Sequence, residues 1–174
     1  MLVNARRGRA VLISIGWGLG VMSGEPAMSV QEILNAKGAK GAKVITVEPT
    51  ALVSFAARLL RLEHIGALVI SRDGTSVDGI LSERDIVYGL IDHGSDVLDK
   101  PVSELMTGHP FTCTPQTGVK EAMRLMSTKR IRHLPVVKDG KLAGIISIGD
   151  VMKNRLDELE LEGHVLHDYI VAHQ

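Results

Sequence analysis

Residues 130–152 read RIRHLPVVKDGKLAGIISIGDVM, and this stretch decides the fold. Two short apolar runs, rich in β-branched residues, flank the pair Asp139-Gly140, and such an arrangement predicts a β-hairpin. Ser147 follows the second run and stands three residues before Asp150, which is the spacing of a helix-capping box. The stretch therefore predicts strand, turn, strand and helix in that order.

The chain contains this arrangement twice. The earlier copy, residues 64–87, reads HIGALVISRDGTSVDGILSERDIV. Its Ser82 and Asp85 align with Ser147 and Asp150 of the later copy. A repeat of roughly 60–70 residues in only two copies predicts a pseudo-symmetric pair, not a solenoid. Further aligned pairs are Val30 with Val102, Glu32 with Glu104, Thr46 with Thr112, Val53 with Val119, Leu68 with Leu134, and Gly79 with Gly144.

At these residues the sequence resembles a tandem pair of CBS (cystathionine β-synthase) motifs, the Bateman module. The resemblance rests on the RHLPVV run and on Gly-Ile-Leu-Ser-x-x-Asp with its partner Gly-Ile-Ile-Ser-x-x-Asp, and it covers about residues 29–153. It implies a mixed α/β (α+β) fold of two β-α-β-β-α units about a pseudo-two-fold axis, with one ligand cleft on each side. It also implies association of such modules as flat dimers.

The expected organisation has four parts. Residues 1–27 have no counterpart in the second copy, and we expect a disordered extension or a mis-assigned start, with a signal peptide as the alternative. Residues 28–100 and 101–153 are the expected CBS motifs, and residues 154–174 the expected C-terminal helix. Apolar residues of that last helix follow heptad spacing, which fits either packing on its own module or pairing across a dimer.

Composition narrows the class of protein. The 174 residues are 45% hydrophobic and 23% charged, which is typical of a globular domain. A formal net charge of zero argues against a protein that coats nucleic acid. Cys113 is the single cysteine, so we expect no internal disulfide, a small buried side chain at this position, and a reducing, cytoplasmic location without membrane contact.

Motifs of catalysis do not occur in the sequence. It has no GxSxG, no glycine-rich phosphate loop and no Cys-His zinc set, so we expect no enzyme and no metal. Glu160, His164 and His167 share one face of the last helix, but three such residues without a partner motif are a weak metal signal. The stretch KGAKGAK at residues 37–43 is expected to be a solvated flexible loop, with contact to a ligand phosphate as the alternative.

The resemblance implies an adenine nucleotide as ligand: AMP, ADP or ATP, with S-adenosylmethionine or NAD(H) as further possibilities. In the family, the aspartate at the helix start accepts hydrogen bonds from the ribose hydroxyls, and this role carries over to Asp85 and Asp150. An ionised carboxylate only accepts hydrogen bonds and therefore suits a cis-diol. The competing interpretation is that Ser-x-x-Asp merely caps the helix.

Basic residues differ between the copies. Arg84 occurs only in the first, whereas Arg130, Arg132 and His133 occur only in the second, so the two clefts cannot be equivalent. We expect a ligand phosphate to lie toward Arg84, Arg132 or His133. The predicted ligand-binding residues are Thr46, Ser82, Arg84, Asp85, Thr112, Arg132, His133, Pro135, Ser147 and Asp150.

The resulting functional prediction is a regulatory sensor. An adenine nucleotide would change the conformation or assembly of a homodimer, and a protein partner would read that change. The alternative is an interaction module whose ligand sites are degenerate, and a failure to bind any nucleotide would favour it.

Overall fold

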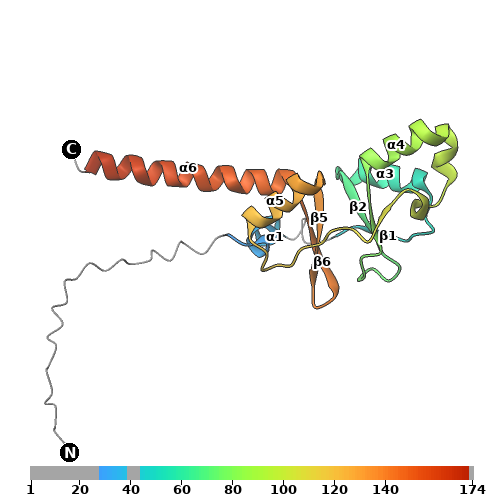
Figure 1. Cartoon of the computed structure of the whole chain (residues 1–174), viewed down its shortest axis with the longest axis horizontal. Coiled ribbons are helices and arrows are strands. Elements are labelled where there is room, and N and C mark those ends of the chain that lie inside the picture. Colours follow the sequence, from blue (N-terminus) through green and yellow to red (C-terminus); the bar gives the residue numbers. More distant parts are fainter. Residues whose placement is uncertain (1–27, 39–43, 173–174) are drawn as a thin grey trace, which may run out of the picture.

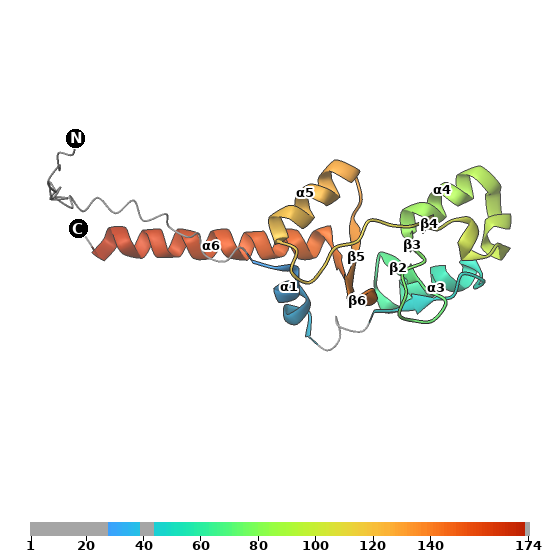
Figure 2. The same cartoon turned by 60° about the horizontal axis from the view of Figure 1, so that its bottom comes forward.

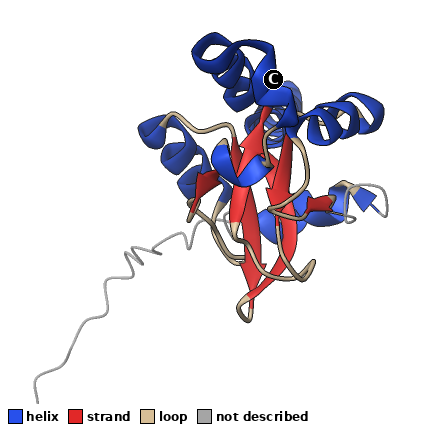
Figure 3. Ribbon diagram, turned by 90° about the vertical axis from the view of Figure 1, so that its right-hand side faces the viewer, coloured by secondary structure: helices blue, strands red, loops and turns tan. Residues whose placement is uncertain are grey.

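A computed structural model describes residues 28–38 and 44–172, with side chains up to residue 160. It contains two units of the same strand and helix order, one at each end of the body (Figure 1). The strands of both units run through the middle of the body, and the helices lie around them (Figure 3). The predictions for residues 1–27 and for most of the 37–43 loop lie outside the described residues.

The first unit is built on a four-stranded sheet. It consists of β1 (Thr46–Val47), α3 (Val53–Glu63), β2 (Ala67–Ile70), β3 (Gly79–Ser82) and α4 (Glu83–His93). Strand β1 is parallel to β2, β2 is antiparallel to β3, and β4 (Thr107–Gly108) adds antiparallel to β3. Two short 3-10 helices, η1 (Gly94–Asp99) and η2 (Val102–Glu104), connect α4 to β4. In α3, the buried residues Val53, Ala56 and Leu60 recur at helical spacing and form one apolar stripe.

The second unit repeats this order. It consists of α5 (Val119–Lys129), β5 (His133–Lys138), β6 (Lys141–Ser147) and α6 (Ile148–Ala172). Strands β5 and β6 are antiparallel, and Asp139 and Gly140 join them with φ of 51° and 74°, which are the positive angles of a type I′ turn. Cys113 pairs in parallel with Val136 and so takes the place that β1 has in the first unit. The predicted hairpin and the two β-α-β-β-α units are confirmed.

The segment that precedes each unit packs on the other unit. Helix α1 (Val30–Ala36) places Val30 in the hydrophobic core of α5, β5 and β6. Val102 of η2, its aligned counterpart, lies in the core of α3, β2 and β3. Backbone hydrogen bonds match on the two sides: Val30 donates to Thr117 and Val102 donates to Ala51. The expected boundary between residues 100 and 101 therefore does not separate the two cores.

Two aligned glycines leave room for side chains of these crossing segments. A Cβ on Gly144 of β6 would lie 2.6 Å from Leu34 of α1, and a Cβ on Gly79 of β3 would lie 2.5 Å from Met106, just after η2. Leu34 and Met106 are also aligned in the repeat. Glycine is thus required at both positions by close approach, which explains why Gly79 and Gly144 recur in register.

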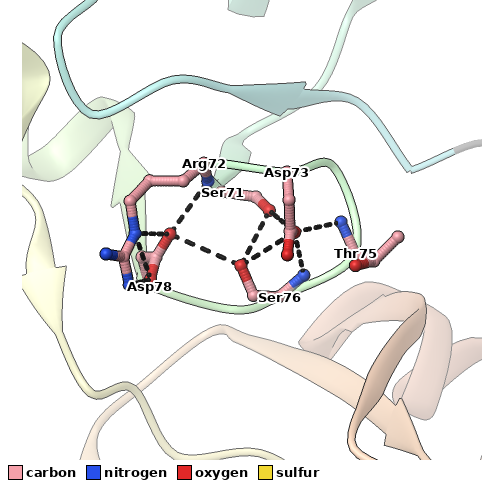
Figure 4. Close-up of polar contacts among 6 residues, drawn as sticks. All are labelled: Ser71, Arg72, Asp73, Thr75, Ser76 and Asp78. Atoms are coloured by element: carbon pink, nitrogen blue, oxygen red, sulfur yellow. Dashed lines mark hydrogen bonds and ion pairs between the residues drawn. The ribbon is translucent and has the colours of Figure 1, made fainter.

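The loop between β2 and β3 departs from the short turn of the second unit. Oδ1 of Asp73 accepts hydrogen bonds from the backbone N–H groups of Thr75 and Ser76, at 2.7 and 2.6 Å, and from the Ser76 hydroxyl (Figure 4). These bonds hold the pKa of Asp73 well below its usual range. Leu142 of β6 donates its N–H to the Thr75 carbonyl, so this ordered loop ties the first unit to the second sheet.

Helix α6 extends away from the body (Figure 2). Its side chains Met152, Leu156 and Leu159 are 55%, 57% and 46% exposed, so along this part the helix does not bury its apolar row on its own module. The remainder of the predicted heptad row lies beyond the described side chains. Among the residues that the structure covers, no helix combines the length and the apolar character needed to cross a membrane.

Candidate functional site

Both predicted helix starts form capping boxes. In α4, the N–H and hydroxyl of Ser82 each donate to Oδ2 of Asp85 at 2.7 Å. In α6, the N–H and hydroxyl of Ser147 donate to Oδ2 of Asp150 at the same distance. Within the described residues, the hydrogen bonds that each carboxylate accepts go to Oδ2, which leaves Oδ1 to accept from a ligand. Capping and ligand binding are therefore compatible roles for these carboxylates.

The first cleft, called cleft 1, surrounds Asp85 and encloses about 250 Å³. It combines the start of α4 in the first unit with the turn that joins α5 to β5 in the second. Arg130 and Arg132 come from that turn, and Arg84 comes from α4. Apolar side chains form the remaining walls, and they come from both units: Ile80, Pro110, Phe111 and Ile131. A cleft with an apolar slot, a carboxylate and a group of guanidinium groups has the parts needed for a phosphorylated nucleoside.

The second cleft, called cleft 2, surrounds Asp150 and encloses about 350 Å³. In cleft 2 the contributions of the two units are reversed: the second unit provides the start of α6, and the first unit provides the turn that joins α3 to β2. That turn contributes Glu63 and His64. Its apolar walls come from Val44, Ile45, Ile65, Ala67, Val69 and Ile145. Each cleft thus needs both units, and a single unit would contain only half of each.

Lys37, at the C-terminal end of α1, reaches into cleft 2. Its ammonium group lies 2.8 Å from Oδ2 of Asp150 and donates to the carbonyl of Ile145 at 3.0 Å. Burial would raise the pKa of Asp150, but the hydrogen bonds from Lys37 and Ser147 outweigh it and lower the pKa below its ordinary value. Asp150 is therefore charged at neutral pH and already neutralised by a cation of the protein itself.

Gly66 and His133 line both clefts and form the wall between them. A Cβ on Gly66 would lie 3.2 Å from Nε2 of His133, so the small residue leaves room for the imidazole. In the repeat, Ala67 is the counterpart of His133. Burial lowers the pKa of His133, with Asp150 opposing this effect, so the imidazole is neutral at pH 7.

The turns that enter the clefts share an unusual backbone. His64 ends α3 with φ of 52°, and Arg130 ends α5 with φ of 55°, both in the left-handed region. Non-glycine residues in this region are uncommon, although a left-handed residue is a frequent way to end a helix. His64 and Arg130 thus end their helices in the same conformation at equivalent positions of the repeat, and they line cleft 2 and cleft 1, respectively.

The structure distributes the predicted site residues unevenly. Cleft 1 brings together Ser82, Arg84, Asp85, Arg132 and His133. Cleft 2 contains Ser147 and Asp150 together with the shared His133. The lining of neither cleft includes the other three predicted residues: Thr46 lies in β1, Thr112 is exposed, and Pro135 is buried in β5.

Several lining residues were not in the predicted set. Arg130 aligns with His64 and carried a signal as a basic residue of the second copy only, but it was not among the predicted ligand-binding residues. Lys37 had a weaker signal as the first lysine of the basic KGAKGAK stretch. Glu63, Glu83 and Phe111 carried no signal, because only the crossing of the two units brings them to a cleft. Within the described residues, no group of three or more His, Cys, Asp or Glu side chains is arranged to hold a metal ion.

Comparison with known proteins places this geometry in a family. The family model described as "CBS domain" matches residues 40–92 and 102–157. The "CBS domain-containing protein CBSX3, mitochondrial" of Arabidopsis thaliana is 34% identical over 85% of this chain and 74% of its own length. A CBS-domain containing protein from Agrobacterium tumefaciens has a crystal structure that is 40% identical, with a TM-score of 0.69, over 74% of this chain and 94% of its own.

Two further solved structures bear on ligands and assembly. The CBS domain pair of protein MJ0100, which is 25% identical with a TM-score of 0.67 over 76% of this chain and 99% of its own, is in complex with 5′-methylthioadenosine and S-adenosyl-L-methionine. A CBS-CP12 protein from bloom-forming cyanobacteria, which is 30% identical with a TM-score of 0.63 over 72% of this chain and 67% of its own, is hexameric. Proteins of this fold thus include an adenosyl-ligand complex and an oligomer.

Proposed function

Because this chain belongs to the CBS domain family, we propose that it is a regulatory CBS pair that binds an adenine nucleotide in cleft 1. The observation that carries the proposal is the meeting of Asp85 with three arginine side chains in one cleft built from both units. Since ligand and cleft would span the two units, binding would bias their relative arrangement. A ligand shifts such an equilibrium only by its differential affinity for the two states.

Each part of a nucleotide has a counterpart in cleft 1. The adenine ring fits among Ile80, Phe111 and Ile131, which provide an apolar slot. Oδ1 of Asp85 accepts from the ribose hydroxyls while Oδ2 keeps its capping bonds to Ser82. Charge-assisted hydrogen bonds between guanidinium groups and phosphate are stronger than neutral ones, which favours ADP or ATP over adenosine in this cleft. S-adenosylmethionine and NAD(H) have fewer or differently placed anionic groups and rank lower here.

Titration calorimetry with ATP on Asp85→Asn tests the assignment. The amide keeps an oxygen for the Ser82 cap but removes the charge, so we expect ATP affinity to fall about 10- to 100-fold, equivalent to about 1.5–3 kcal/mol for a lost charge-assisted bond. The matched control is Glu32→Gln. Glu32 closes the same kind of capping box on Ser29 of α1, outside both clefts, and its loss should leave ATP affinity unchanged.

A purely structural role for the carboxylates predicts the opposite pattern. Asp85→Asn and Glu32→Gln would then change the melting temperature by similar small amounts and leave affinity alone. Wild-type protein that binds no adenine nucleotide at millimolar concentration would refute the sensor and favour an interaction module.

Self-association is the second element of the proposal. The outer faces of α3 and α4 expose large apolar side chains: Leu52, Phe55, Leu62, Val87, Tyr88, Leu90 and Ile91. Apolar patches of this extent on a surface indicate a contact face. We infer that a second copy covers this face in a homodimer. Light scattering on Phe55→Lys should give the monomer mass, and an unchanged mass would exclude this face.

The remaining features of the proposal follow from these two. A change in the dimer on nucleotide binding would be the signal that a partner protein reads. The cytoplasmic location expected from the lone Cys113 stays part of the proposal, as does the absence of catalysis. An ATP hydrolysis rate above the buffer background that Asp85→Asn abolishes would favour an enzyme.

A further inference from the structure

The charges that line the two clefts have opposite balance. Three arginines face the two carboxylates Glu83 and Asp85 in cleft 1, which leaves an excess of positive charge. Among the described residues that line cleft 2, one lysine, Lys37, faces the two carboxylates Glu63 and Asp150, which leaves an excess of negative charge in this part of the lining. The histidine common to both, His133, is neutral at pH 7 because burial lowers its pKa.

Lys37 is moreover already paired within the protein. Its ammonium group already binds Oδ2 of Asp150 and the carbonyl of Ile145, and the two paired side chains are only 25% and 22% exposed. Moving Lys37 onto a ligand phosphate would leave the half-buried Asp150 without its cation, and removing one partner of such a pair is costly. Glu63 would in addition repel the phosphate.

From this difference we propose that the clefts sort adenosyl ligands by charge: cleft 1 takes the phosphorylated nucleotide, and cleft 2 takes an adenosyl compound whose 5′ substituent carries no negative charge. Lys37 is the residue that sets this specificity, because it satisfies Asp150 without offering an unpaired cation. Oδ1 of Asp150 remains for the ribose, and the apolar residues Val44, Ile45 and Ile65 remain for the base. The inference rests on the proposed function and adds the ligand class of the second site.

Two probes test it by titration calorimetry: ATP and 5′-methylthioadenosine, a neutral adenosyl compound. Wild-type protein should bind one ATP per chain. With ATP at saturation, it should still bind one equivalent of 5′-methylthioadenosine, and Asp150→Asn should weaken only this second event, about tenfold or more. Lys37→Met should leave the ATP stoichiometry at one. Lys100→Met, which removes a lysine paired with Glu104 away from both clefts, is the matched control.

A gain of function provides the second arm. Glu63→Lys changes an exposed side chain at the end of α3 and adds a cation to cleft 2 that has no carboxylate already paired with it. We expect this variant to bind a second ATP per chain. If Glu63→Lys still binds only one ATP per chain, charge is not the cause of the difference between the clefts.

The outcomes separate this inference from the proposed function. Two ATP molecules per wild-type chain, one of them lost in Lys37→Met, would show that Lys37 leaves Asp150 for phosphate and would overturn only the charge sorting. If wild-type protein binds one ATP but, when saturated with ATP, binds no 5′-methylthioadenosine, this would likewise overturn only the charge sorting. Binding of neither probe to wild-type protein would overturn the proposed function and the inference together.

Discussion

Ser82 with Asp85 and Ser147 with Asp150 are the same capping box, with the same 2.7 Å bonds, yet their carboxylates meet different neighbours. Around Asp85 the other unit contributes arginines, and around Asp150 it contributes Glu63 and His64, while α1 contributes Lys37. Repetition therefore preserved the backbone of the cleft and varied its charge. The difference teaches that in such a pair the charge of each cleft is set by the residues around the shared Ser-x-x-Asp box, since the box itself is common to both sites.

The largest effect on ATP affinity should come from replacing, one at a time, the residues that end α5 and α3 by glycine. Arg130→Gly removes a guanidinium group from cleft 1 and relaxes a left-handed backbone that glycine adopts freely. We expect ATP affinity to fall about 10- to 100-fold with no loss of melting temperature. His64→Gly makes the same backbone change at the equivalent position in cleft 2 and should leave ATP affinity unchanged. Equal losses of affinity in the two variants would contradict the division of roles.

The next largest effect, on the free energy of unfolding, should come from substituting the two glycines, Gly144 and Gly79, that contact the crossing segments. Gly144→Ala pushes a methyl group against Leu34, and overpacking of this kind costs about 1–3 kcal/mol in the free energy of unfolding. Gly79→Ala should cost less, because the flexible Met106 thioether can move away more readily than a branched leucine. Urea titration of both variants measures the difference. Leu34→Ala combined with Gly144→Ala should cost less than the sum of the single changes, and additivity would show that the two residues are not in contact.

A smaller effect should follow from pH. Burial lowers the pKa of His133, so the folded state favours the neutral imidazole. The contribution of neutral His133 to the free energy of unfolding is then fully present above the unfolded pKa of about 6.5. It is lost as the pH falls through the lower pKa of the folded state. Melting temperature should therefore drop as the pH falls below about 6.5, and His133→Gln should flatten that slope. An unchanged slope in the variant would assign the drop to other groups.

The smallest effect should come from Cys113, whose counterpart in the first unit is Val47. Both side chains are buried in equivalent places of the two cores, so Cys113→Val should change stability by less than about 1.5 kcal/mol. Burial, with a contribution from Glu121, raises the pKa of the thiol to about 11. A disulfide reagent should accordingly modify the thiol in denaturant but hardly in the folded protein at pH 7. Fast modification of the native chain would show that this core opens readily.

Local signals in the sequence predicted most of the fold. Asp139-Gly140 marked the hairpin, Ser82 and Ser147 marked the helix starts, and the stripe of Val53, Ala56 and Leu60 marked a buried helix face. The eight-residue loop around Asp73 was not foreseen, because its aligned Asp-Gly pair suggested a short turn and the hydrogen bonds of Asp73 depend on the loop's own path.

The clefts were predictable only in part. The helix-start carboxylates are contiguous motifs, so Asp85 and Asp150 could be named from the sequence as cleft residues. Their neighbours are set by the packing of one unit on the other, which aligning the two copies cannot reveal. Lys37 illustrates this, since it lies far from Asp150 in sequence and reaches it only because α1 crosses to the second unit.

The crossing of α1 and η2 also fixes an order of events during synthesis. Val30 leaves the ribosome long before the core that receives it is made, because that core includes Leu134, Ile146 and Val151. The first unit, in contrast, is complete once β4 has been made, at Gly108. Translation adds about 5–20 residues per second, so α1 waits for seconds with its apolar side uncovered. The nascent chain therefore passes through a state in which one unit is finished and its leading helix is still unattached, and that state is where a chaperone has most to protect.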